Sequence, residues 1–151
     1  MSDKPGRSNT DGFSAQERAA MKQRAAELRE EANRGGRGKK AAVEELDVLS
    51  KIAEMDPADR VVAERIHAIV TTTAPELSPK LWYGQPAYAR KGKVVCFFRS
   101  GQVDKERYST FGFTTEANLD DGGLWPTSYA VTALSDNTEQ ELTALVKRAV
   151  S

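Results

Sequence analysis

Residues 78–98, SPKLWYGQPAYARKGKVVCFF, decide the fold. Their last five residues, VVCFF (94–98), are apolar at every position, which predicts a central strand with both faces covered. Before this run, Lys91-Gly92 separates two extended segments, and glycine tolerates the positive φ of a two-residue hairpin turn. We therefore expect strands over residues 86–90 and 93–98, paired as an antiparallel hairpin.

The sheet is expected to continue after this hairpin. RYSTFGF (107–113) alternates in polarity and predicts a third strand, and TSYAVTAL (127–134) predicts a fourth. Residues 137–150 then carry apolar side chains at helical spacing, and Thr138 and Glu141 have the spacing of a capping box. A closing helix is therefore expected after the last strand.

Two helices are expected before the sheet. Residues 40–54 place valine, leucine and isoleucine on one broad helical stripe, and residues 57–73 do the same. Asp56 is placed to cap the second of these helices, and Pro57 suits its first position, where a missing N–H costs nothing. Helices, then antiparallel strands, then a closing helix indicate an α+β fold rather than an alternating βαβ fold.

The N-terminal forty residues differ in character from the rest. Residues 1–12 are polar and lack periodicity, which predicts a disordered N-terminus. Ser14 and Glu17 have the spacing of a capping box, so a helix is expected over residues 13–34.

This helix is expected to have only a thin apolar face and to attach loosely to the main domain. After Ser14, its only apolar residues besides alanine are Met21 and Leu28, and GGRG (35–38) follows as a flexible joint. The predicted organisation is a disordered N-terminus (1–12), a charged helical extension with a glycine-rich joint (13–40) and an α+β domain (41–151).

Bulk properties exclude several classes of protein. The chain has 151 residues and no net charge, and its longest apolar run is far shorter than the ~20 residues that cross a bilayer. Its first residues lack the apolar core of a secretory signal, and its single cysteine fits a reducing compartment, so a cytoplasmic location is expected. Residues 1–40 carry ten Lys/Arg and six Asp/Glu, but GRGKK (36–40) is their only tight basic cluster, which does not favour nucleic-acid binding.

Aromatic residues gather in the sheet region, and two proline-containing corners display them. In WYGQPAY (82–88), glycine permits a backbone bend and proline fixes its own φ, and GGLWPTS (122–128) has the same character. Trp and Tyr carry polar groups that favour the walls of pockets, but bulky aromatics also fill the core of a small sheet, so both interpretations stay open. The candidate ligand-binding residues are Trp82, Tyr83, Gly84, Pro86, Tyr88, Trp125 and Tyr129.

The remaining reactive side chains do not form a catalytic motif. His67, the only histidine, borders an apolar helical stripe and has no nearby histidine or cysteine in the sequence, which predicts a partly buried, hydrogen-bonded side chain. Cys96 lies within VVCFF and is expected to be an unreactive core thiol. The sequence has no nucleophile motif and no phosphate-binding glycine loop, so we predict no catalytic residue and no enzymatic activity.

Carboxylates are the candidates for binding iron or another hard cation. They do not have the spacing of an EF-hand or of a His/Glu metal triad, and lysines and arginines are interleaved with them. A solvated surface is therefore the favoured interpretation, and no metal ligand is predicted. The carboxylates considered are Glu44, Glu45, Asp47, Asp56, Asp59, Asp120 and Asp121.

The segment LSPKLWYGQPAYARKGKVVCFF resembles the YdhG-like family of domains of unknown function. That family has a similar aromatic-Gly-x-Pro-x-Tyr corner before a short turn and an apolar strand, and the resemblance extends over residues 47–150. It implies a small α+β domain in which a curved antiparallel sheet of about four to five strands packs against helices, broadly as in frataxin. The family pattern matches Tyr83, Gly84, Pro86 and Tyr88. Some relatives are labelled iron chaperones, so the resemblance implies iron as an alternative ligand.

Together these observations predict a small cytosolic, non-enzymatic binding module with an aromatic pocket or groove for a small ligand. One alternative is an iron-binding protein that uses surface carboxylates. Another is a protein-interaction module that uses the helix over residues 13–34. The ligand, the partner and the oligomeric state are not specified by the sequence.

Overall fold

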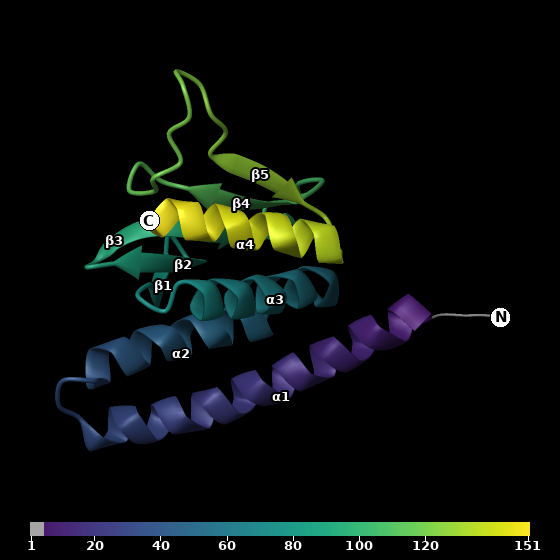
Figure 1. The fold of residues 1–151 in the computed structure, drawn as a ribbon. Helices are drawn as coiled ribbons and strands as arrows, with labels where there is room; N and C mark the ends of the chain where they lie inside the picture. The colour runs from purple at the N-terminus through teal and green to yellow at the C-terminus, as the bar shows by residue number, and fades with distance from the viewer. Residues whose placement is uncertain (1–4) are drawn as a thin grey trace.

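The computed structural model describes residues 5–151, with side chains described from Ala15 onward. It confirms the predicted α+β class: four helices accompany one five-stranded antiparallel sheet (Figure 1). Residues 1–4, part of the segment predicted to be disordered, lie outside the described residues. The elements are α1 (Pro5–Arg34), α2 (Lys39–Ala53), α3 (Pro57–Thr73), β1 (Ser78–Trp82), β2 (Gln85–Arg90), β3 (Lys93–Arg99), β4 (Ser109–Phe113), β5 (Ser128–Val131) and α4 (Asp136–Val150).

The sheet is a meander in which each strand pairs with the next along the chain, so β3 is central, as predicted. The Lys91-Gly92 turn between β2 and β3 is confirmed, with φ values of 53° and 82°. Strand β1 was not predicted. The turn that joins it to β2 is Tyr83-Gly84, with φ values of 53° and 75°, so the predicted corner is a second two-residue hairpin turn.

The main core lies between one face of the sheet and the helices. Figure 1 shows α3 and α4 side by side against the sheet, with α2 below them and α1 farthest from the strands. Tyr88, Phe98 and Phe111 are among the largest fully buried side chains, and they meet apolar residues of α3 and α4. This arrangement accounts for Val95, Cys96 and Phe98, the residues of the run 94–98 that belong to this core.

Other aromatic residues pack on the opposite face of the sheet. Phe97 pairs across the strands with Ala87 and Gly112, and a Cβ atom at Gly112 would approach the Phe97 ring to 2.5 Å. The glycine therefore leaves the room that the ring occupies. Trp82 contacts the same ring, with 5.2 Å between ring centroids, so both side chains are half-buried on this face.

Helix α1 is longer than predicted. It begins at Pro5, so residues 5–12 are helical rather than disordered, and Ser14 lies inside the helix instead of capping it. Proline is compatible with the first turn of a helix, because the N–H groups there have no partner within the helix.

Helix α1 is also docked rather than loosely attached. Leu28 is buried against Ala42 and Leu49 of α2, which form a second, smaller core. An ion pair strengthens this contact. Nε and Nη2 of Arg24 each donate a hydrogen bond to the Glu45 carboxylate, at 3.0 and 3.1 Å.

Helix α4 begins at Asp136, one residue before the predicted position. Ser135 is its N-cap: the Ser135 hydroxyl accepts a hydrogen bond from the Thr138 backbone N–H, and the Thr138 hydroxyl accepts one from the Ser135 N–H. The predicted capping box of Thr138 and Glu141 was therefore wrong by one turn. The predicted position of helix α3 is confirmed, with Asp56 at the N-cap position and Pro57 in the first turn, but the Asp56 side chain makes no capping hydrogen bond.

Replacing Leu28 by alanine tests the independence of the second core. We expect Leu28→Ala to weaken the docking of α1 by about 2–3 kcal/mol, since it truncates the most completely buried side chain of this cluster. Hydrogen exchange measured by NMR should speed up for amides of α1 and stay slow in β2–β4. Leu124→Ala, at a residue that is 91% exposed, is the matched control. Equal acceleration in α1 and in the sheet would show that the two cores unfold together.

Candidate functional site

The seven predicted ligand-binding residues do not form one site. Tyr83, Gly84 and Pro86 line a hollow of about 460 Å³ between the first hairpin turn, the C-terminal end of α2 and the β3–β4 loop. The Tyr83 side chain is 86% exposed, while Pro86 is buried. Trp82 lies on the outer face of the sheet, as described above.

The other predicted aromatic residues lie elsewhere. Trp125 lines a separate hollow of about 430 Å³ beside Phe113 and Leu119. Tyr129 packs edge-on against Phe113, with 6.2 Å between ring centroids, and its hydroxyl donates a long hydrogen bond of 3.4 Å to the Pro126 carbonyl. The two proline corners therefore lie at different places on the molecule.

Tyr88 lies entirely within the core. Its hydroxyl is 2.9 Å from Nδ1 of His67, a residue of α3. Burial lowers the pKa of the His67 imidazole to about 4, so the ring is neutral at pH 7. The prediction of a hydrogen-bonded histidine is confirmed, and its partner is one of the tyrosines singled out in the sequence.

Cys96 lies beside Tyr88 on the paired strand β3 and is fully buried. Burial raises the pKa of the thiol to about 12. The predicted core position of this thiol is confirmed. Because the thiolate is the reactive form, the raised pKa agrees with the expected low reactivity.

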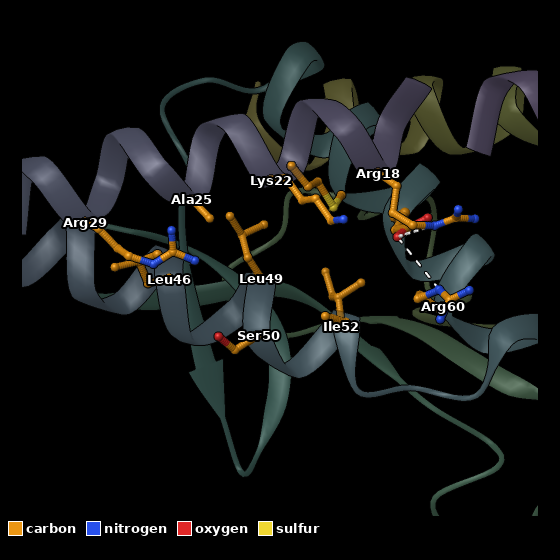
Figure 2. A pocket seen from close by; sticks show the side chains of 12 residues that line it. Arg18, Lys22, Ala25, Arg29, Leu46, Leu49, Ser50, Ile52 and Arg60 are labelled. Atoms are coloured by element: carbon orange, nitrogen blue, oxygen red, sulfur yellow. Dashed lines mark ion pairs between the residues drawn. The ribbon is translucent and has the colours of Figure 1, made fainter. Parts of the chain in front are cut away.

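A cavity of about 730 Å³ forms a groove between α1 and α2 that reaches α3 (Figure 2). Leu46, Leu49 and Ile52 of α2 form an apolar floor, and Ala25 of α1 contributes only a methyl group. Figure 2 shows Arg29 near one end of the groove and Arg18 and Arg60 near the other, with the apolar residues between them. The groove exists because the alanine-rich face of α1 is too thin to fill the space beside α2.

A buried carboxylate lies at one end of this groove. Glu64 of α3 is 2% exposed, and its Oε2 is 3.8 Å from Nε of Arg18 and 4.0 Å from Nε of Arg60. Its other oxygen, Oε1, has no hydrogen-bond partner among the described residues, and neither of these two arginine Nε atoms has one. Burial raises the pKa of the Glu64 carboxyl group, and the two arginines oppose that rise. Three buried polar atoms without partners are an exception to the general rule that such atoms are paired.

Two further cations line the groove. Lys22 and Arg29 lie on the same face of α1 as Arg18, and neither forms an ion pair within the described part of the chain. The groove therefore combines an apolar floor with an excess of positive charge: four cations face one carboxylate.

The groove residues were not among the predicted site residues. Only Glu64 could have pointed to the groove from the sequence, since it falls among the apolar positions of the helix over residues 57–73. A carboxylate in such a stripe indicates a buried charge that needs a partner. The partner Arg18 comes from α1, and nothing in the sequence pattern relates the two helices.

The carboxylates considered for iron binding do not gather. Among the side chains that the structure describes, from residue 15 onward, no group of three His, Cys, Asp or Glu residues is placed to hold a metal ion. Glu45 is paired with Arg24, and Asp59 accepts hydrogen bonds from the Ser100 hydroxyl and the Gln102 N–H. None of the helices over these residues is both long enough and apolar enough to cross a membrane.

Comparison with known proteins does not extend this description. No family model, curated protein or solved structure matches the chain. The resemblance to the YdhG-like family therefore stays a prediction.

The pKa of His67 predicts how stability depends on pH. The folded-state pKa of about 4 is below the unfolded value of 6.5. The neutral His67 therefore leaves the free energy of unfolding at its full value above pH 6.5, and this free energy decreases as the pH falls toward 4. The loss from this group is roughly 3 kcal/mol. Urea unfolding of the wild type and of His67→Gln between about pH 7 and about pH 4 measures it, and the variant should lack this part of the loss.

An NMR titration provides a check that needs no variant. The single histidine gives one imidazole Hε1 signal, so its titration is assigned without ambiguity. A midpoint near 6.5 in the folded protein would contradict the prediction.

Proposed function

We propose that this protein is a non-enzymatic binding module that holds an amphipathic, anionic small molecule in the groove between α1 and α2. The observation that carries the proposal is the presence of two cations without ion-pair partners, Lys22 and Arg29, above an apolar floor. Arg18 and Arg60 share the single counter-ion Glu64, so Lys22 and Arg29 are the two cations of the groove lining that have no carboxylate beside them among the described side chains.

The lining suggests how such a ligand lies. Its acidic group pairs with Lys22 and Arg29 at the edge of the groove, where the long side chains reach it from α1. Its apolar part lies against Leu46, Leu49 and Ile52. Because Leu49 and Ile52 are already buried, the apolar surface removed from water is that of the ligand and of the half-buried Leu46. A volume of about 730 Å³ is within the range of small-molecule sites.

The proposal also concerns which part of the chain carries the function. The cations Arg18, Lys22 and Arg29 all come from α1, which precedes residues 47–150, the part that resembles the YdhG-like family. We therefore infer that ligand binding in the groove belongs to the helical extension together with the domain, and that the domain alone does not bind the same ligand.

Three eight-carbon probes that differ in their head group test the charge requirement. We expect octanoate to bind measurably by isothermal titration calorimetry, 1-octanol to bind more weakly and octylammonium to bind most weakly. Replacing both cations, in Lys22→Glu with Arg29→Glu, should weaken octanoate binding about tenfold or more, because two attractions become repulsions.

A matched control keeps the change in net charge constant. Lys40→Glu with Lys147→Glu alters two exposed lysines outside the groove and should leave octanoate binding unchanged. If both double variants weaken binding equally, or if 1-octanol binds as tightly as octanoate, the proposal is wrong.

A further inference from the structure

A second cavity, of about 390 Å³, lies on the other side of the contact between α1 and α2. Met21 and Leu49 line both this cavity and the groove, so these two side chains form a shared wall. We call it the His67 cavity. Its lining residues are Glu17, Ala20, Met21, Arg24, Glu45, Leu49, His67, Ala68, Thr71, Thr72, Pro75, Leu77 and Pro79.

His67 is the buried polar side chain in this lining. It is only 6% exposed, and its Nδ1 is bonded to Tyr88 in the core. The second ring nitrogen, Nε2, makes no hydrogen bond to a protein group within residues 15–151. The two nitrogens lie on opposite sides of the imidazole, so Nε2 is directed away from Tyr88. The charges that act on this ring belong to Glu45 and Arg24, which line the cavity.

The partner of Nδ1 determines which nitrogen carries the proton. Tyr88 is completely buried, and its hydroxyl has His67 as its hydrogen-bond partner in the described part of the chain. The tyrosine proton needs an acceptor, because a buried hydroxyl without one is costly. Nδ1 is that acceptor, and the neutral imidazole then carries its hydrogen on Nε2. His67 therefore presents an N–H donor without a protein acceptor.

The charged residues around the cavity do not favour a charged ligand. The Glu45 carboxylate is paired with Arg24, and the Glu17 carboxylate is 2.6 Å from Nη1 of Arg65. An anion would approach both carboxylates without gaining a free cation, and a cation would face the His67 N–H. The rest of the lining is mainly apolar, with Leu77 and Pro79 among its members.

We propose that the His67 cavity binds a small, uncharged and mainly apolar molecule through a carbonyl-type oxygen that accepts a hydrogen bond from His67 Nε2. Tyr88 acts as a positioning residue, because it selects the tautomer without touching the ligand. This site is distinct from the proposed anion-binding groove, and it differs from that groove in the charge of its ligand.

The tautomer is measured first, on the wild-type protein. Histidine labelled with ¹⁵N gives two ring nitrogen signals, both from His67, since the chain has no other histidine. We expect the signal of a protonated nitrogen at Nε2 and of an unprotonated nitrogen at Nδ1 near pH 7. The opposite tautomer, with hydrogen on Nδ1, overturns the proposal.

Three probes of similar shape then test the ligand class. Acetophenone carries a carbonyl oxygen, α-methylstyrene replaces that oxygen by a CH₂ group, and benzoate is an anion. We expect acetophenone to shift the Nε2 signal and to bind about tenfold more tightly than either of the others, the amount expected for one hydrogen bond. Equal binding of acetophenone and α-methylstyrene, or tighter binding of benzoate, overturns the proposal.

Two tyrosine variants test the positioning role. Tyr88→Phe removes the donor to Nδ1, so we expect loss of the single tautomer and about tenfold weaker acetophenone binding. Tyr129→Phe is the control, because it removes a hydroxyl whose one long hydrogen bond goes to the Pro126 carbonyl, at a residue that does not line the His67 cavity. It should change neither the tautomer nor the affinity. If Tyr88→Phe keeps the tautomer and the affinity, Tyr88 has no positioning role.

One variant distinguishes ligand binding in the His67 cavity from ligand binding in the groove. The Lys22→Glu with Arg29→Glu variant changes residues that line only the groove, so it should leave acetophenone binding unchanged. A loss of acetophenone binding in that variant would show that the probe occupies the groove and would overturn the assignment to the His67 cavity.

Discussion

The structure depends on α3 being buried on most of its surface. Helices α1 and α2 cover one side of it, and the sheet and α4 cover another (Figure 1). A helix in this position has little exposed surface on which to place polar side chains, so its polar residues must find partners inside the protein. Seven of its residues are buried: Val62, Ala63, Glu64, Ile66, His67, Ile69 and Val70.

The two buried polar residues of α3 meet this requirement differently. His67 becomes neutral and shares a hydrogen bond with Tyr88, so the cost of its burial appears as a lowered pKa. Glu64 has two arginines at 3.8 and 4.0 Å, distances at which attraction remains but hydrogen bonds are not formed. Glu64 lines the groove and His67 lines the His67 cavity, so each cavity beside α1 contains one buried polar side chain of α3.

The sequence predicted elements that rest on local patterns and missed those that rest on contacts. The run 94–98 and the Lys91-Gly92 turn specify a buried hairpin strand without help from distant residues. Strand β1 contains Pro79, which is tolerated because β1 is an edge strand, and edge position is not visible in the sequence. The same limit applies to the cavities, because the pairs Tyr88–His67 and Arg18–Glu64 join elements far apart in the chain.

The joint after α1 has a consequence for how the two cavities open. Gly35 and Gly36 adopt φ values of 74° and 83°, and only four residues connect α1 to α2. A helix on so short a connection stays at a high local concentration beside its docking face. Any separation of α1 from α2 is therefore a unimolecular step whose equilibrium does not change with protein concentration. Because Met21 and Leu49 line both cavities, that one step exposes both binding surfaces to solvent together.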